Sequence, residues 1–493
     1  MDPAGSIRET VDRALADLQR VLGPGPTSDL TGALRAEFAE PLRVAVGGRI
    51  KAGKSTLVNA LLRQRVAPTD VGECTRFVTW YRYGLPERLE VVLTTGERVR
   101  RPLRNDGSLP PEIDIPGDTV HHLDVFLSND QLRRVTVIDT PGLASAVEGR
   151  SEATRELLAL DRDSRAAVSQ ADVLLLVMAL DARADDDEVL GSFEAQFDGL
   201  RRTALNAAAV LSRIDLLDTP SAEVRVRAGA VADTIARRLR TPVSAVVPVA
   251  TLLAETIECG LLSEEDVAAL AELARLGETE RAGLLRTTDR FISIDAGVPP
   301  ARRGRLLERL DLHGVTVALN HLATHGPGTA ALLRRLREEA GIDDFRERVL
   351  DAVARHGDVL KCARLLATLA RAGDDGAVRH AVLGVLEQLW LDPSLHAVRL
   401  QRAAQLHSAG EASLPADLAQ ELHALARGAT GAVPAAGAAA LARAASRWRT
   451  YANSGRAGAA EREVADTVCR AYELQYERLR DLTDSTDSTG SSG

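Results

Sequence analysis

The stretch "VAVGGRIKAGKSTLVNALL" (residues 44–62) joins a short apolar run to a helical run through a glycine-rich loop. From Gly48 to Ser55 the loop fits the pattern G-x-x-x-x-G-K-[ST], and strand, loop and helix follow in the order in which this pattern binds phosphate. Glycines let backbone N–H groups turn toward phosphate oxygens, and the helix N-terminus adds positive potential. The stretch therefore predicts a phosphate-binding loop at the edge of a parallel sheet.

The same stretch holds two of the three lysines of a chain that has 61 lysine and arginine residues. An ammonium is a compact charge on a thin stem, whereas a guanidinium is a wide planar fork. We therefore expect Lys54 to reach the β and γ phosphates and Ser55 to bind Mg²⁺. The residues predicted to line the phosphates are Gly48, Arg49, Gly53, Lys54, Ser55 and Thr56.

Two later segments supply groups that a nucleoside triphosphatase needs. In "VTVIDTPG" (135–142), Asp139 ends an apolar run and is expected to hold Mg²⁺ through water, while the N–H of Gly142 contacts the γ-phosphate. In "VAPTDVGECTRFVTW" (66–80), a threonine hydroxyl is expected to close over Mg²⁺ and the γ-phosphate. We favour Thr75 for this role and keep Thr69 as the alternative.

A fourth segment, Ser212-Arg213-Ile214-Asp215, addresses the base. The usual guanine-reading sequence is N/T-K-x-D, whose aspartate accepts hydrogen bonds from N1–H and N2–H₂ of guanine, a donor pair that adenine lacks. Asp215 keeps this group and the stem of Arg213 can still stack on the base, whereas Ser212 departs from the pattern. Ala250, at the end of "VVPVA" (246–250), is expected to supply the last loop around the base. The predicted substrate is GTP; a simple turn at the end of a strand is the alternative.

Lys51 stands three residues before Lys54 in the same loop. GTP hydrolysis needs a positive charge near the bridging oxygen, and small GTPases take it from an arginine of a partner. Lys51 or Arg49 is expected to supply this charge from within the chain; a solvated loop residue is the alternative for Lys51. Leu143 stands where many GTPases have a water-positioning glutamine, so the water must be held by backbone groups, by Thr75 or by a second subunit.

Short β-rich runs alternate with helical stretches between residues 42 and 250. The runs cover residues 42–46, 77–83, 88–94, 120–127, 133–139, 172–178, 206–212 and 245–250. This alternation predicts an α/β P-loop GTPase domain with a mostly parallel sheet and helices on both faces. After about residue 300 the pattern is helical and predicts an extended all-α bundle. Amphipathic helices are also predicted at 6–22 and 460–482.

Composition limits the partners and the compartment. The chain has 493 residues and a net charge of −9, which gives no general attraction to nucleic acid, so no nucleic-acid partner is expected. Four scattered cysteines and a charged N-terminus without a signal-peptide pattern predict a cytoplasmic protein. The longest apolar run, 173–180, is shorter than the about 20 residues of a membrane span, so membrane contact is expected to be peripheral.

In this order, "GGRIKAGKSTLVNALL", "APTDVGECTRFVTWYRYG", "VTVIDTPG" and "LSRIDLLD" resemble bacterial dynamin-like GTPases, in particular the IniC-type (isoniazid-inducible) branch of actinobacteria. The specific resemblance covers about residues 40–300. It implies that the helices 6–22 and 460–482 pack together in a neck. The predicted domains are N-terminal helices that pack with the neck (1–40), a dynamin-type GTPase domain (41–295), a helical neck and trunk (300–482) and a disordered tail (483–493).

The resemblance also implies a function. It indicates a GTPase that binds and hydrolyses GTP with Mg²⁺, associates with itself through its GTPase faces, and remodels or protects the inner face of the plasma membrane. A second dynamin-like protein is an implied partner. Since no clear membrane-insertion loop is present, two alternatives remain: a weakly hydrolysing scaffold that acts with that second protein, and a regulatory GTPase switch that binds a protein effector.

Overall fold

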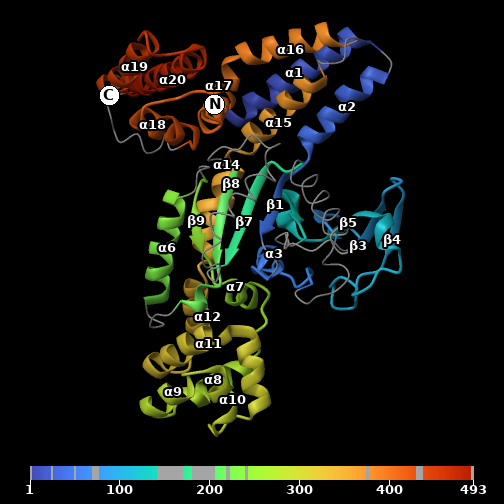
Figure 1. Cartoon of the computed structure of the whole chain (residues 1–493), viewed down its shortest axis with the longest axis vertical. Coiled ribbons are helices and arrows are strands. Elements are labelled where there is room, and N and C mark those ends of the chain that lie inside the picture. Colours follow the sequence, from blue (N-terminus) through green and yellow to red (C-terminus); the bar gives the residue numbers. More distant parts are fainter. Residues whose placement is uncertain are drawn as a thin grey trace, which may run out of the picture.

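The computed structural model describes residues 3–23, 26–48, 51–68, 77–141, 170–179, 206–217, 223–238, 243–372, 378–428 and 437–489. Within these residues, one sheet of nine strands crosses the middle of the molecule in the order β4-β3-β5-β2-β6-β1-β7-β8-β9 (Figure 1). β1 (Leu42–Gly48) lies between β6 (Val135–Asp139) and β7 (Val173–Ala179), and both run parallel to it. Every residue of β1 is buried, as expected for a strand that is covered on both faces.

The strands on either side of this centre differ in direction. β8 (Ala207–Ser212) and β9 (Val246–Pro248) extend the parallel sheet beyond β7. On the other side, β2 (Thr79–Tyr83) is antiparallel to β6 and parallel to β5 (Val120–Leu127). The antiparallel strands β3 (Arg88–Leu93) and β4 (Arg98–Arg101) complete that edge. The predicted mostly parallel α/β sheet is confirmed, and each of the eight predicted runs contains a strand.

β4 is the strand that the sequence did not predict. Its residues read RVRR, and Arg98 and Arg100 are exposed. This short edge strand pairs only with β3, and its charged side chains protect the open edge from pairing with another chain. Because its residues are mostly charged, it lacks the apolar pattern by which a strand is recognised.

The carboxyl ends of the parallel strands face a group of helices at one end of the molecule (Figure 1). α3 (Lys54–Leu62) follows the phosphate loop and packs against β1, β6 and α7. The group consists of α7 (Thr251–Glu258), α8 (Glu264–Ala274), α9 (Glu278–Leu284), α10 (Thr288–Ser293), α11 (Pro300–His325) and α12 (Thr329–Ala340). Buried side chains of α8, α11 and α12 belong to the same apolar cluster as the sheet, and α6 (Val224–Arg238) packs beside β9. α11 and α12 thus share the core of the sheet although they follow residue 300, and the predicted domain limits stay a prediction.

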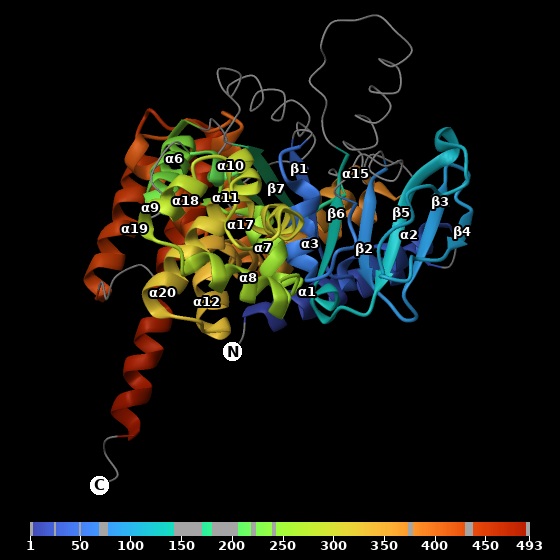
Figure 2. The ribbon, with the colours of Figure 1, turned by 90° about the horizontal axis from the view of Figure 1, so that it is seen from below.

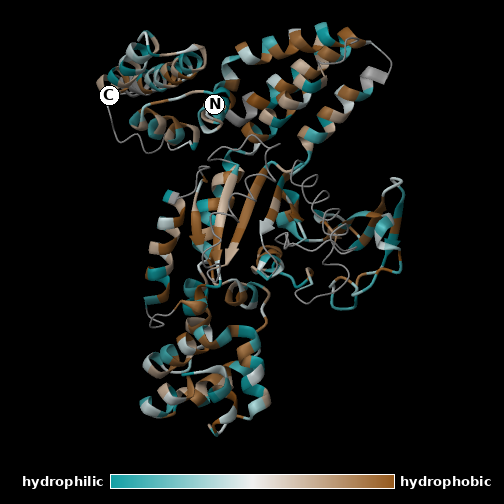
Figure 3. Ribbon diagram, in the orientation of Figure 1, coloured by the Kyte–Doolittle hydropathy of each residue, from teal (hydrophilic) through white to brown (hydrophobic). Residues whose placement is uncertain are grey.

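The chain then returns to the opposite end of the sheet. The return runs through α13 (Ile342–Phe345), a π-helical turn (Arg346–Asp351) and α14 (Ala352–Arg355). A second apolar cluster joins α1 (Pro3–Leu22), α2 (Pro26–Ala39), α15 (Gly357–Ala372) and α16 (Arg379–Leu391). A third joins α17 (His396–Ser408), α18 (Ala416–Ala426), α19 (Ala438–Ala452) and α20 (Ala459–Thr489). Figure 3 shows hydrophobic central strands, whereas the helices alternate between hydrophobic and hydrophilic faces.

Three helical predictions need correction. The first helix begins at Pro3, not at residue 6. It packs against α15 and α16, whereas α20 packs against α17 and α19, so the helices 6–22 and 460–482 are not partners. An apolar stripe shows which face of a helix is buried but not against what. α20 also continues to Thr489, into the predicted disordered tail, and its last turns project from the molecule (Figure 2).

Among the residues that the structure describes, no helix combines the length and the apolar character that a membrane span requires.

Candidate nucleotide-binding site

Two glycines shape the loop between β1 and α3. Gly48 has φ +149°, and a Cβ there would lie 2.3 Å from the carbonyl oxygen of Val177 on β7. Gly53 has φ +89°, and a Cβ there would lie 2.9 Å from Oγ1 of Thr251, the first residue of α7, and 3.9 Å from Cβ of Ser212. Only glycine fits both positions without a shift of the surrounding chain. The loop after β1, the end of β8 and the start of α7 therefore lie close together, where the sequence predicts a nucleotide.

Lys54 and Asp139 form the charged centre of this site. Lys54 opens α3 and is 7% exposed; burial lowers the pKa of its ammonium, and the charge of Asp139 opposes this change. Asp139 ends β6, and burial raises its pKa to about 6, against the opposing effects of Lys54 and Ser55. The lysine and the carboxylate are thus close enough for their charges to interact.

The oxygen atoms of Asp139 and Ser55 fit a bound Mg²⁺. Ser55 Oγ lies 3.4 Å from Oδ2 of Asp139, and Oδ1 of Asp139 is buried without a hydrogen-bond partner. Carboxylate and hydroxyl oxygens are ligands that Mg²⁺ accepts, and an orphaned buried oxygen costs free energy until a ligand satisfies it. Thr56, the next residue of α3, is partly buried.

The predicted base-reading segment also lies at the carboxyl ends of the parallel strands, directly after β8. Ser212 is fully buried, and its Oγ lies 2.6 Å from the carbonyl oxygen of Ala52 and 2.9 Å from that of Met178. The serine hydroxyl therefore bonds to backbone of the loop after β1 and of β7, and it is not left to contact a ligand. Arg213 follows with φ +55°, and Asp215 lies in the 3-10 turn η4 (Ile214–Leu216).

Ala250 and Lys51 differ in what they have available for a ligand. Ala250 is 2% exposed, and its N–H donates to the carbonyl oxygen of Ala340 over 3.0 Å. Lys51 is exposed, has φ +62°, and makes no hydrogen bond or ion pair within the described residues. The exposed side chain of Lys51 is therefore available for its predicted contact with the phosphates. The N–H of Ala250 already has a partner and is not available for the predicted contact with the base.

Part of the predicted site lies outside the described residues. This part comprises Arg49, Thr69, Thr75, Gly142 and Leu143. Their predicted roles stay predictions.

Asn59, on α3, was not predicted to matter. It is fully buried, its Nδ2 donates to Glu255 Oε1 over 2.7 Å, and its Oδ1 accepts from the N–H groups of Val66 and Ala67. Asn59 thereby holds the start of the segment that leads to the predicted threonines. A polar side chain within the apolar run "LVNALL" was the signal that pointed to it.

A second buried carboxylate joins α3 to the helices that return toward the other end of the sheet. Glu258, at the end of α7, accepts ion pairs from Arg63 (3.0 Å), Arg337 (2.7 Å) and Arg346 (2.5 Å). These arginines follow α3, lie on α12 and open the π-helical turn, respectively. No local pattern announces such a contact, because its members are separated by up to 283 residues (346 − 63).

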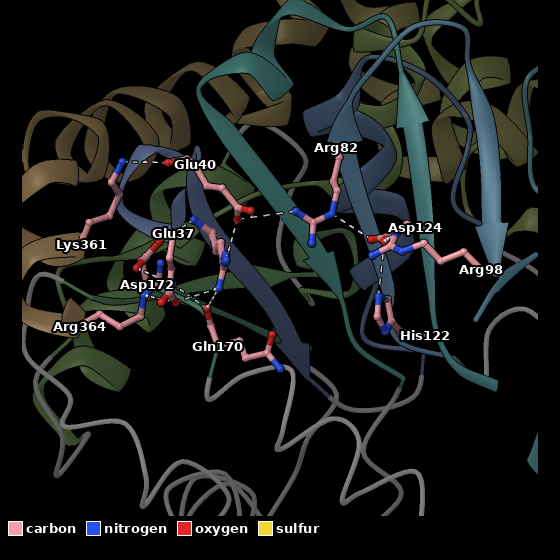
Figure 4. A network of polar contacts seen from close by, with 11 residues as sticks. Glu37, Glu40, Arg82, Arg98, His122, Asp124, Gln170, Asp172, Lys361 and Arg364 are labelled. Carbon is pink, nitrogen blue, oxygen red and sulfur yellow. Dashed lines mark hydrogen bonds and ion pairs between the residues drawn. The ribbon is translucent and has the colours of Figure 1, made fainter. Parts of the chain in front are cut away.

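A different polar network lies at the amino ends of the central strands β1 and β7 (Figure 4). Asp172, just before β7, pairs with Arg364 of α15 at 2.9 Å and accepts from the N–H of Arg43 on β1 over 2.8 Å. Arg43 also pairs with Glu40 at 2.6 Å, and Lys361 of α15 donates to the carbonyl oxygen of Glu40 over 2.8 Å. This network fastens the sheet to α2 and α15.

The same network continues along β2 and β5. Asp124 pairs with Arg82 at 2.9 Å and with Arg98 at 2.8 Å (Figure 4). Burial by itself would raise the pKa of Asp124, but His122 and Arg82 together lower it to about 2.

Comparisons with known proteins agree with this site. Residues 44–190 match the model of the Dynamin family. The chain is 32% identical over 342 residues to the isoniazid-induced protein IniC of Mycobacterium tuberculosis (strain ATCC 25618 / H37Rv), with 68% of each chain covered. It is 35% identical over 72 residues to a bacterial dynamin-like protein of Nostoc punctiforme, covering 15% of this chain and 9% of that protein.

Solved structures add only a distant likeness. A structure of an oligomerised bacterial dynamin pair is 11% identical and covers 99% of this chain and 77% of its own, with a TM-score of 0.32. The structure of Era from Aquifex aeolicus bound to GDP and aluminium fluoride is 17% identical and covers 48% of this chain and 69% of its own, with a TM-score of 0.25. From its sequence relatives, the chain belongs to the dynamin family, among the bacterial dynamin-like proteins that include IniC.

Proposed function

We propose that the chain binds GTP with Mg²⁺ at the loop between β1 and α3 and hydrolyses it. The observation that carries this proposal is the arrangement of Lys54, Ser55 and Asp139, in which a buried ammonium faces a buried carboxylate whose Oδ1 has no hydrogen-bond partner. Such a pair is costly in a protein without ligand and is balanced when a phosphate and a cation bind between its members.

The residues of the chain divide the work between phosphates, metal and base. Lys54 would neutralise phosphate charge, and the N–H groups at the start of α3 would donate to phosphate oxygens. Ser55 and Asp139 would hold Mg²⁺, which when bound offsets the negative charge of the β and γ phosphates. Asp215 would accept from the donor edge of guanine, with Arg213 against the face of the base. Lys51, exposed on its strained loop, would bring positive charge to the bridging oxygen.

The test is nucleotide hydrolysis by the full chain with Mg²⁺. We expect phosphate release from GTP but not from ATP, and a rate per molecule that rises with protein concentration if the GTPase faces associate. Lys51→Ala is expected to lower kcat about tenfold with little change in KM if its charge acts only in the transition state. Equal hydrolysis of ATP and GTP would contradict the role of Asp215, and an unchanged kcat in Lys51→Ala would contradict the role of Lys51.

Self-association and membrane remodelling or protection at the inner face of the plasma membrane form the wider part of the proposal. They are supported by membership of the dynamin family. Co-sedimentation with vesicles of anionic lipid, with and without GTP, tests membrane contact. No association in either state would contradict direct action on the bilayer.

A second candidate is a weakly hydrolysing scaffold that acts with another dynamin-like protein. It is favoured by the internal hydrogen bonds of Ser212 and Ala250, which leave fewer groups for the base than a tight guanine site has. A GTP turnover that stays low at all protein concentrations and rises when a second dynamin-like protein is added would favour the scaffold.

A further inference from the structure

α11 is interrupted at Asp311, a residue to which the sequence assigned no role. Asp311 has φ +49° and ψ −173°, a non-helical conformation within a helix of 26 residues. Its Oδ1 accepts from the N–H of His313 over 2.6 Å and from that of Gly314 over 3.1 Å, so it caps the second half of α11. On the other side of the break, the carbonyl oxygen of Arg309 accepts from the hydroxyl of Thr256. These three backbone groups at the interruption therefore have partners.

The break lies beside the base-reading turn. α11 packs against η4, the turn that carries Asp215, as well as against α7 and α12. Burial, together with the negative charge of Asp215, raises the pKa of Asp311 to about 7, and the N–H groups that it caps oppose this rise. The carboxylate of Asp311 is thus close enough to Asp215 for the two charges to repel one another.

Capping alone does not explain the conformation of Asp311. An N-cap residue ordinarily has an extended backbone with negative φ, and a non-glycine residue at positive φ is strained. In the described chain, five non-glycine residues have positive φ: Lys51, Arg63, Asp114, Arg213 and Asp311. Lys51 and Arg213 belong to the proposed phosphate and base loops, and Arg63 ends the helix that follows the phosphate loop. Backbone strain of this kind is common at ligand sites. Asp311 is therefore a third strained residue, with Lys51 and Arg213, near the proposed nucleotide site.

The second oxygen of Asp311 is available to a ligand. Within the described residues, Oδ2 of Asp311 makes no hydrogen bond or ion pair, and although Asp311 lies among packed helices it keeps some solvent exposure. Guanine presents three hydrogens on its donor edge, one on N1 and two on N2. Asp215 can accept from N1–H and from one N2–H, which leaves the second N2–H without an acceptor.

We propose that Asp311 accepts a hydrogen bond from the second N2–H of guanine and is therefore a second base-reading carboxylate, contributed by the helices that follow β9. This inference rests on the proposed GTP site. The added acceptor compensates for the hydroxyl of Ser212 and the N–H of Ala250, both of which are used inside the protein.

The test measures the Kd of GDP, inosine diphosphate and N2-methyl-GDP, with Mg²⁺, for the wild-type chain and for Asp311→Asn. Inosine lacks the N2 amino group, and N2-methylguanine replaces one of its hydrogens with a methyl group. Asn keeps an oxygen for the cap but presents no negative charge. The wild type is expected to bind N2-methyl-GDP about tenfold more weakly than GDP, the usual size of a hydrogen bond to a charged group at a partly exposed site. Asp311→Asn is expected to lose about tenfold in GDP affinity and almost none for inosine diphosphate.

Thr287→Ala is the matched control. Thr287 caps α10 in the same group of helices through its hydrogen bond from the N–H of Arg290, and its loss is expected to leave the preference for GDP over inosine diphosphate unchanged. An unchanged preference in Asp311→Asn, or an equal loss for both nucleotides, would show that Asp311 is only a cap. If Asp311→Asn does not fold, equal binding of GDP and N2-methyl-GDP by the wild type overturns the inference. Failure of the wild type to bind GDP or GTP at all would instead remove the proposed function.

Discussion

At the carboxyl edge of the sheet, Asp139 ends β6 with a buried oxygen that has no hydrogen-bond partner and a buried lysine nearby. At the amino edge, Asp172 precedes β7 and is held by the guanidinium of Arg364 and the N–H of Arg43. Burial raises the pKa of both carboxylates, so burial does not distinguish them. Each carboxylate also has one buried oxygen without a hydrogen bond, Oδ1 of Asp139 and Oδ1 of Asp172, but that of Asp172 lies 2.9 Å from the guanidinium of Arg364. The contrast therefore lies in the ion pair: a buried carboxylate without one marks a candidate ligand site, whereas a carboxylate paired with an arginine of another element marks a joint between elements.

The lysines repeat this contrast. Lys54, at the carboxyl ends of the strands, opens a helix directly after the predicted phosphate loop. Lys361, at the amino edge, is 5% exposed, donates to the carbonyl oxygen of Glu40 at the end of α2, and lies 5.2 Å from the ring centre of Phe38. One ammonium is expected to act on a ligand, and the other closes the end of a helix.

The largest expected effect is on activity, at the carboxyl edge. Lys54→Ala should lower GTP turnover about thousandfold, because no other described side chain brings a buried positive charge to this loop. The melting temperature should stay within a few degrees of wild type, because burial of this ammonium is itself unfavourable. Phosphate release and circular-dichroism melting measure the two effects, and turnover within tenfold of wild type would contradict the assignment.

The next effect is on stability, at the amino edge. Asp172→Ala should lower the free energy of unfolding by about 3 kcal/mol, because it leaves the guanidinium of Arg364 buried without this carboxylate. GDP affinity of the folded protein should be unchanged. The double variant Asp172→Ala/Arg364→Met is the control and should recover part of the loss; if it is no more stable than the single variant, the pair is not the cause.

A pH titration addresses the part of the network around Asp124. The folded pKa of about 2 lies below the value of about 3.9 for an unfolded aspartate, so ionised Asp124 stabilises the fold above pH 4, and this contribution is lost as the pH falls toward 2. We expect Asp124→Asn to lower the free energy of unfolding by about 2 kcal/mol at pH 6. The gap between the two proteins should narrow as the pH is lowered from 4 toward 2. The exposed Asp118→Asn serves as the control, and a gap that does not change with pH would count against the ion pairs.

The smallest expected effect concerns Lys361. Lys361→Met keeps the length of the buried stem but removes the donor to Glu40, and should lower the free energy of unfolding by about 1 kcal/mol. GTP turnover should not change. Chemical denaturation with turnover measured in parallel checks both, and a loss of turnover as large as that in Lys54→Ala would erase the distinction between the two edges.

Much of the fold was predictable because its signals are local. The eight predicted runs are apolar or alternate in the period of a strand, and each contains one. β4 was missed since a charged edge strand has no apolar pattern, and the partner of the first helix was wrong because its stripe fits any apolar surface. In the site, the order of motifs predicted where Lys54, Ser55 and Asp139 would meet, but not that Ser212 and Ala250 would use their polar groups internally.

The sequence by itself determined the glycine-rich loop, its strand and helix, and the family, because this motif depends on residues that are neighbours along the chain. Only the tertiary structure decided which polar groups remain for a ligand and which carboxylates face one another. Asp215 and Asp311 stand 96 positions apart (311 − 215), and the packing of α11 on η4 brings their charges together. Such contacts depend on how whole helices pack, and no short stretch of sequence predicts that packing.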